Sequence, residues 1–109
     1  MSDRLAEQEC EPCHGGVPPL EGEELVSLLD ELPPGWEAVD GHHLAKTFEF
    51  EDFVSALDFV NEVGELAEEQ GHHPDLHLSW GEVTVEIWTH AIDGLSENDF
   101  FLAAKIERI

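Results

Sequence analysis

The chain has 109 residues, a length that suits one domain with a single hydrophobic core. It contains 26 acidic and only 4 basic residues, for a formal net charge of −22. We therefore expect it to bind neither nucleic acid nor anionic membranes. No apolar run approaches the roughly 18 residues of a membrane span, and residues 1 to 8 lack the apolar core of a signal peptide, which predicts a soluble protein of the cytoplasm. Adaptation to a salty cytoplasm and general solubility both explain such an acidic surface.

Residues 1 to 20 are predicted to form an irregular, flexible arm, because a Gly-Gly pair and a Pro-Pro pair interrupt them. The arm holds both cysteines, and Cys10 and Cys13 fall in a C-x-x-C-H pattern that also marks covalent haem attachment. Haem attachment is disfavoured because the chain shows no export signal and no later methionine for an axial ligand. A zinc site would need two further ligands, and a thiol redox motif would need a preceding strand. We therefore predict no metal or redox role for the arm, and a single domain over residues 21 to 109.

Helical and alternating apolar patterns predict the elements that follow the arm. A leucine stripe predicts a short helix over residues 22 to 32, which a Pro-Pro-Gly sequence ends. Residues 36 to 39 and 44 to 50 are predicted to form a first hairpin. A second stripe predicts a helix of about five turns over residues 52 to 70, and Gly71 stops it as a C-terminal cap. The residues of that stripe are Phe53, Ala56, Leu57, Val60, Val63 and Ala67.

A second hairpin and a last helix complete the predicted fold. Residues 75 to 80 and 83 to 90 alternate apolar and polar side chains on either side of Gly81. Ser96, followed by an acid three residues later, is typical of a capping box and opens the last helix. The order α-β-β-α-β-β-α predicts the α+β class, with a four-stranded antiparallel sheet and helices packed on one face. The free face and the edge strand favour a homo-oligomer.

Three histidines are predicted to meet at one end of the second hairpin. His72 lies just past the helix stop, and Pro74 holds His73 in an extended conformation. Antiparallel pairing about Gly81 returns the end of the fourth strand to the start of the third, which brings His90 toward the other two. Histidine has an unperturbed pKa of roughly 6.5 and exchanges protons near neutral pH, so the cluster suggests general acid–base catalysis.

Each of these residues also has a simpler explanation. Interaction with the helix dipole would account for His72 alone, and capping for Asp99. Glu68 lies on an exposed acidic face, and Trp80 alternates with apolar residues as a core side chain would. Three histidines and a water also form a catalytic zinc site, but Pro74 disrupts the helix that would set two histidines one turn apart. Three further histidines are predicted to be ordinary exposed residues: His42, His43 and His77.

Seven residues of this region complete a longer pattern, E-x3-H-H-P-x5-W-x9-H-x8-D. They are Glu68, His72, His73, Pro74, Trp80, His90 and Asp99. The pattern resembles the signature of the pterin-4a-carbinolamine dehydratases. The similarity extends over about residues 22 to 108, and it includes the Gly-Leu-Ser sequence that precedes the last helix.

The resemblance implies a fold, a reaction and a set of site residues. The fold is the same α-β-β-α-β-β-α order, and the reaction is dehydration of a 4a-hydroxytetrahydropterin to the quinonoid dihydropterin, without a metal or organic cofactor. This activity recycles the cofactor of aromatic amino-acid hydroxylases, and we expect a homodimer or homotetramer that is functionally linked to such a hydroxylase. A non-catalytic pterin-binding or partner-regulating module is the alternative. The implied catalytic residues are His72, His73, His90 and Asp99, and the implied substrate-binding residues are Glu68, Pro74 and Trp80.

Overall fold

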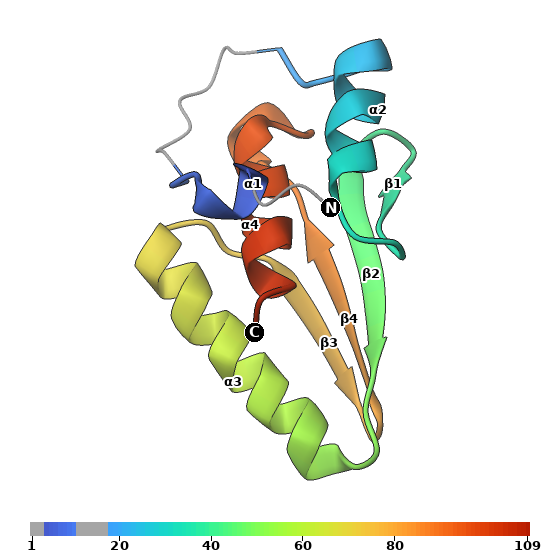
Figure 1. The fold of residues 1–109 in the computed structure, drawn as a ribbon, viewed down its shortest axis with the longest axis vertical. Helices are drawn as coiled ribbons and strands as arrows, with labels where there is room; N and C mark the ends of the chain where they lie inside the picture. Colours follow the sequence, from blue (N-terminus) through green and yellow to red (C-terminus); the bar gives the residue numbers. More distant parts are fainter. Residues whose placement is uncertain (1–3, 11–17) are drawn as a thin grey trace.

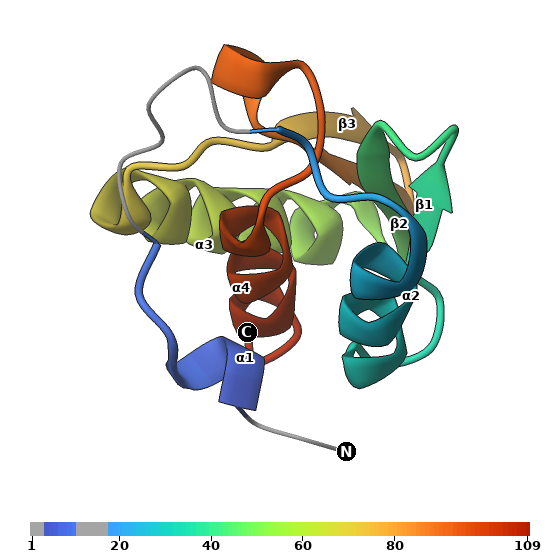
Figure 2. The same cartoon turned by 90° about the horizontal axis from the view of Figure 1, so that it is seen from above.

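One four-stranded antiparallel sheet, with helices packed on one of its faces, forms the fold (Figures 1 and 2). The computed structural model describes residues 4 to 10 and 18 to 109. The strand order is β1-β2-β4-β3, so β1 and β3 are the edges. The predicted α+β class is therefore confirmed. The elements are α1 (Arg4–Glu7), α2 (Gly22–Glu31), β1 (Glu37–Val39), β2 (His43–Glu49), α3 (Phe53–Gln70), β3 (Asp75–Ser79), β4 (Glu82–Ile87), the 3-10 helix η1 (His90–Ile92) and α4 (Glu97–Ile106).

The face of the sheet that the helices cover carries the core. Along β4, Val83, Val85 and Ile87 are fully buried, whereas Thr84 and Glu86 between them are partly exposed. Removing an aliphatic side chain of this kind from water stabilises a fold by about 1.5–3 kcal/mol. The same core includes Leu44 of β2 and the α4 residues Phe100, Leu102 and Ile106. The alternation predicted for the fourth strand therefore sets which of its side chains lie under the helices.

The helix α3 runs diagonally beside the sheet, starting at the bottom of the view near the end of β2 (Figure 1). It begins at Asp52, whose side chain accepts a hydrogen bond from the Ser55 N–H at 2.8 Å. It ends at Gly71, whose φ of 66° lies in the left-handed region that favours glycine. The prediction that Phe53 and Leu57 face inward is wrong, because these side chains are 42% and 37% exposed. The buried residues of α3 are Ala56, Phe59, Val63 and Ala67. Within the described part of the chain, no helix is long and apolar enough to cross a membrane.

The end of β4 differs from the prediction. The fourth strand does not continue to residue 90, because the chain turns back on itself after Ile87. The Thr89 N–H donates to the Gly94 carbonyl at 2.8 Å, and the two residues form an isolated bridge. Asp93 closes this turn with a left-handed φ of 48°. His90 is therefore the first residue of a 3-10 turn and not the last residue of a strand.

The short helix α1 lies where the sequence suggests an irregular arm. Its Leu5 is fully buried. The ammonium of Lys105, in α4, donates to the Ala6 carbonyl at 2.9 Å. The guanidinium of Arg4 pairs with both carboxylate oxygens of Glu31 at the end of α2. The buried Leu5 and the contacts of Arg4 and Lys105 thus attach this segment to the domain. The composition of the arm does not predict these contacts.

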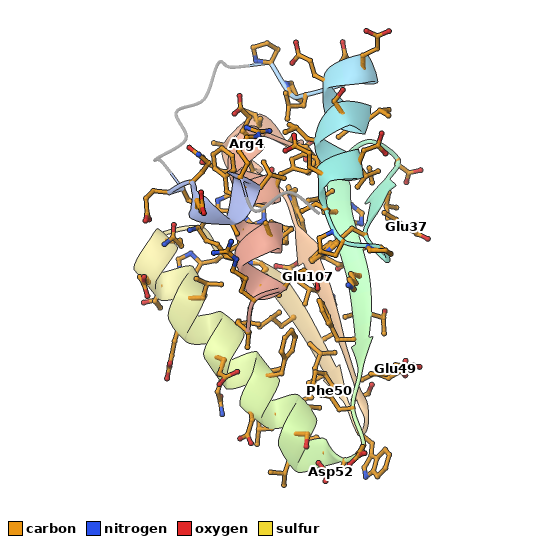
Figure 3. All side chains as sticks on the ribbon, viewed as in Figure 1. Arg4, Glu37, Glu49, Phe50, Asp52 and Glu107 are labelled. Carbon is orange, nitrogen blue, oxygen red and sulfur yellow. The ribbon has the colours of Figure 1, made fainter. Side chains whose placement is uncertain are left out.

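Glu107, just after α4, connects the end of the chain to the first hairpin (Figure 3). Its Oε1 accepts a hydrogen bond from the Trp36 indole N–H at 2.9 Å and pairs with the Lys46 ammonium. Lys46 also donates to the Pro34 carbonyl at 3.0 Å, and its Nζ lies 4.8 Å from the centroid of the Phe48 ring. These contacts hold the C-terminal end of α4 against the first hairpin.

Candidate active site

A buried carboxylate holds the first of the predicted histidines. The His72 backbone N–H donates to the Ala67 carbonyl at 3.2 Å, so the chain wraps the end of α3 after Gly71. The imidazole Nε2 of His72 lies 2.5 Å from Oδ1 of Asp99, and the two side chains are 13% and 0% exposed. A carboxylate oxygen accepts from an imidazole N–H, so this contact favours the tautomer with the hydrogen on Nε2 and leaves Nδ1 for another partner.

Asp99 joins three segments through its two oxygens. Its Oδ2 accepts hydrogen bonds from the Ser96 N–H at 2.8 Å and from the Thr89 hydroxyl at 2.9 Å. The predicted capping box is confirmed, since Ser96 and Asp99 bond reciprocally at the start of α4. A helix N-terminus also favours a negative charge there. Capping and a role in the site are therefore compatible, because one carboxylate holds α4, the end of β4 and His72.

His73 pairs with Glu68 at the protein surface. Its Nε2 lies 2.5 Å from the Glu68 Oε2, and the two side chains are 58% and 79% exposed. An exposed pair of this kind contributes typically less than about 1 kcal/mol to stability. Its effect is instead to hold the His73 ring against the last turn of α3. The structure thus brings together two of the residues in the motif.

His90 reaches the same end of the sheet through β4. The pairing of β3 with β4 ends at Asp75 and Glu86, so His73, two residues before β3, lies near the end of β4. The ring centroid of His90 lies 4.5 Å from that of Trp88. His72 is attached to the same end of β4 through Asp99 and its bond from the Thr89 hydroxyl. The three predicted histidines therefore lie at one end of the sheet, each with a different partner.

The three histidines predicted to be ordinary have defined partners. His42 and His43 contact each other through Nδ1 atoms 3.1 Å apart, and their ring centroids lie 5.4 and 5.8 Å from that of Trp88. His77 Nε2 lies 2.8 Å from the Glu86 Oε1, with its side chain 61% exposed. The pairing of β2 with β4 brings His42 and His43 beside the site. Sequence reasoning missed both, because strand order and register join residues more than forty positions apart.

Trp80 lies at the other end of the sheet. It is 69% exposed, so the alternative of a core position is wrong. It lines a hollow with Glu49 and Phe50, and Figure 3 shows both of these at the narrow end of the molecule. An extended residue advances the chain by about 3.3 Å, which puts Trp80 on the order of 20 Å from His73. The fold of one chain does not bring Trp80 to the histidines, whereas Pro74 adjoins His73 directly.

Cys10 packs between α3 and α4. Its N–H donates to the Gln70 Oε1 at 3.0 Å, and its Sγ lies 3.7 Å from the Asn98 carbonyl oxygen. Burial raises the pKa of the Cys10 thiol to about 11, so it stays protonated at neutral pH. Cys13, the other cysteine of the C-x-x-C-H pattern, lies outside the described residues. Among the residues that the structure does describe, no three His, Cys, Asp or Glu side chains are placed to hold a metal ion.

A family model described as pterin 4 alpha carbinolamine dehydratase matches residues 18–109. The chain belongs to this family. The match contains every element from α2 to α4 and the whole histidine motif. The family resemblance of the motif is therefore confirmed.

Members of the pterin-4a-carbinolamine dehydratase family match this chain over almost its whole length. A protein of Rubrobacter xylanophilus is 61% identical over 105 residues, which cover 96% of this chain and 97% of that one. A protein of Rickettsia canadensis is 55% identical over 103 residues, or 94% of both chains. Both carry the name pterin-4-alpha-carbinolamine dehydratase as a provisional assignment. A crystal structure described as a transcriptional coactivator/pterin dehydratase from Brucella melitensis is 32% identical, with a TM-score of 0.77 over 83% of this chain and 96% of that one.

Proposed function

We propose that this chain dehydrates a 4a-hydroxytetrahydropterin to the quinonoid dihydropterin. The observation that carries the proposal is the placement of His72, His73 and His90 at one end of the sheet, each held by a different group. Membership of a family named for this reaction, and relatives that carry the same name, support it. The protein is then a hydro-lyase that works with its own side chains and without a metal or organic cofactor.

The reaction requires one proton donor and one proton acceptor. The C4a–O bond of the substrate breaks as an imidazolium protonates the leaving oxygen, which departs as water. A neutral imidazole accepts the N5 proton, and the electron pair of the N5–H bond forms the C4a–N5 double bond. One proton is given and one is taken, so the net charge of the protein does not change. Positioned acid–base groups of this kind accelerate reactions by about 10²–10⁴-fold.

The contacts of the three imidazoles suggest how they divide this work. His73 and His90 are exposed rings, and we assign direct proton transfer with the substrate to them. His72 is mostly buried, and its bond to Asp99 fixes its tautomer, so that its Nδ1 is available toward the substrate. Glu68 orients His73 from the end of α3. Asp99 acts as a positioning residue, since it reaches the substrate only through His72.

The proposal includes an assembly. The strands β1 and β3 are free edges, and α3 exposes Phe53, Val54 and Leu57 on its surface. Unpaired strand edges and exposed apolar side chains favour self-association, so we propose a homodimer or homotetramer. Small-angle X-ray scattering should give a molecular mass of two or four chains. A mass of one chain at micromolar concentration would contradict this part.

The cellular role follows from the product. The quinonoid dihydropterin is the form that a reductase can return to the tetrahydropterin, so we propose that the chain supports an aromatic amino-acid hydroxylase in the cytoplasm. The alternative is a pterin-binding module that regulates a protein partner. The description of the Brucella melitensis relative as a transcriptional coactivator/pterin dehydratase is the observation that favours this alternative.

Loss of the 4a-hydroxypterin intermediate, followed by absorbance, tests the enzyme against the binding module. The wild-type chain should accelerate this loss over the uncatalysed rate, and His73→Ala should slow it by at least about 10²-fold, because one proton-transfer group is gone. His77→Ala is the matched control, because His77 is also an exposed imidazole paired with a glutamate, yet it lies four residues further along the chain. Equal rates for wild type and His73→Ala would reject the enzymatic proposal.

A further inference from the structure

Trp88 lies on the face of the sheet that the helices leave open. Val83, Val85 and Ile87 of β4 are buried under the helices, so the alternate residues Glu86 and Trp88 belong to the other face. Figure 2 shows α2, α3 and α4 on one side of the sheet. Trp88 is only partly buried, although an indole is a large apolar group that folding usually covers. Trp88 packs against the border of the core, and part of its side chain stays exposed.

Imidazole rings surround this indole. The ring centroids of His90, His42 and His43 lie 4.5, 5.4 and 5.8 Å from that of Trp88, with interplanar angles of 65°, 43° and 56°. We call these four residues the open-face cluster. The pairing of β3 with β4 ends at Asp75 and Glu86, so His73, two residues before β3, lies near the same end of β4. The indole thus packs directly against one of the two exposed imidazoles to which proton transfer is assigned, that of His90.

The open-face cluster is held in place from both sides. His42 Nε2 lies 2.8 Å from the Asp93 Oδ1, so the turn before β2 is joined to the turn that carries His90. His43 contacts His42 through Nδ1 at 3.1 Å, and its Nε2 lies 3.6 Å from the Glu86 Oε2. These contacts fix the two rings that pack against Trp88, and hence the orientation of the indole.

We propose that Trp88 is the surface on which the pterin ring stacks, with C4a and N5 directed toward His73 and His90. A pterin is a flat, fused heteroaromatic ring, and stacking of such rings on an aromatic side chain strengthens binding by about tenfold or more. The indole offers this surface on the uncovered face, directly beside the exposed imidazole of His90. This inference rests on the proposed function, because it names the group that holds the substrate of that reaction.

Indole N–H resonances in a ¹H–¹⁵N NMR spectrum report the position of the ligand directly. The chain has three tryptophans, so three signals are expected, and single Trp→Phe variants assign them. The probe is 7,8-dihydropterin, which has no 4a-hydroxyl group and cannot be dehydrated. On titration the Trp88 signal should shift most. A shift confined to Trp36 or Trp80, or no binding of the probe, would overturn the inference.

The affinity for the same probe, measured by calorimetry, provides the second test. Trp88→Leu should raise Kd by about tenfold, because the stacking surface is lost, whereas Trp88→Phe should stay within about threefold, because a ring remains. His77→Ala, on the same face but outside the open-face cluster, should leave Kd unchanged. An unchanged Kd in Trp88→Leu would overturn the inference.

The two proposals fail separately. Trp88-dependent binding without turnover would reject the dehydratase and keep the stacking surface. Turnover that is lost in His73→Ala, with a Trp88 signal that does not move, would keep the dehydratase and reject the stacking surface.

Discussion

At the residue scale, the Asp99 carboxylate orients the His72 imidazole and anchors the start of α4. It is fully buried, and its oxygens accept hydrogen bonds from Ser96, Thr89 and His72. Both of its buried oxygens therefore have hydrogen-bond partners, as buried polar groups in folded proteins generally do. The same three bonds orient the imidazole of His72, and the structure and the chemistry of this end of the sheet therefore depend on one group.

Asp99→Asn should retain the fold and lose activity. The amide oxygen can still accept from Ser96 and Thr89, but the amide N–H₂ then faces Nε2 of His72 and favours the other tautomer. We expect kcat to fall by at least about tenfold with little change in KM, since the effect is on proton transfer and not on binding. The ¹⁵N shifts of the His72 ring should report the exchanged tautomer.

The control for Asp99→Asn is Glu97→Gln. Glu97 is an exposed acid in the same first turn of α4, so its neutralisation changes the charge of that turn without touching His72. It should leave kcat unchanged. Equal losses of activity in both variants would mean that the helix charge, and not the contact with His72, is responsible.

Cys10 makes a second prediction at the residue scale. Burial raises its thiol pKa to about 11, so the fraction of reactive thiolate at pH 8 is small. In a Cys13→Ser background, alkylation of the folded chain by iodoacetamide should be at least about tenfold slower than in urea. The raised pKa also predicts stability that is present below about pH 9 and is lost as the pH rises through about 11. Equal alkylation rates in the folded and unfolded chain would contradict the burial of this thiol.

At the element scale, replacing the glycine within α3 and the glycine that caps it by alanine should change the free energy of unfolding in opposite directions. Gly64 lies within α3, where an added Cβ meets no atom within 4 Å, so Gly64→Ala should stabilise the helix by about 0.5–1 kcal/mol. Gly71 also has room, but its φ of +66° is strained for alanine, so Gly71→Ala should destabilise by about 1 kcal/mol. Urea unfolding measures both free energies. Effects of the same sign would refute the assignment of Gly71 as a left-handed cap.

Elements with local signals were predicted well. The stop at Gly71 and the capping box at Ser96 were read from a few neighbouring residues, and both agree with the structure. The cap at Asp52 was not predicted, although the predicted start of the helix agrees to within one residue. The stripe on α3 was less accurate, because Phe59 and not Leu57 faces the core. A helix face some 100° wide leaves such border positions open until the packing is known.

The parts of the site that sequence reasoning missed depend on long-range pairing. His42 and His43 meet Trp88 because β2 pairs with β4, with Leu44 level with Ile87. No local pattern encodes that register, since it is set by the whole sheet. The helix α1 was missed for the same reason, because its stability comes from contacts with α2 and α4 and not from its own four residues.

At the scale of the whole molecule, charge is the dominant feature. With 26 acidic and 4 basic residues, the folded chain repels itself, and the ion pairs of Arg4 and Lys46 offset only a small part of that repulsion. Salt shortens the Debye length from about 10 Å at 0.1 M to about 3 Å at 1 M. Thermal stability should therefore rise with salt. The opposite is expected for a protein whose stability depends mainly on attractive surface ion pairs.

Thermal melts in 0.05 M and 1 M NaCl test this prediction. The midpoint should increase with salt, and the increase should be smaller in the variant Glu62→Lys/Glu65→Lys, because these exposed positions of α3 would then carry positive charge. The matched variant Glu62→Gln/Glu65→Gln should give an intermediate increase. A midpoint that falls with salt would show that attractive pairs outweigh the net charge.

The central claim is that exposed imidazoles at one end of the sheet carry out the dehydration. Single-turnover dehydration of the 4a-hydroxypterin by the double variant His73→Ala/His90→Ala tests it most directly, with His77→Ala as the reference for lost surface imidazole. The double variant should be slower than wild type by at least about 10²-fold, and His77→Ala should match wild type. A double variant that turns over at the wild-type rate would contradict the account.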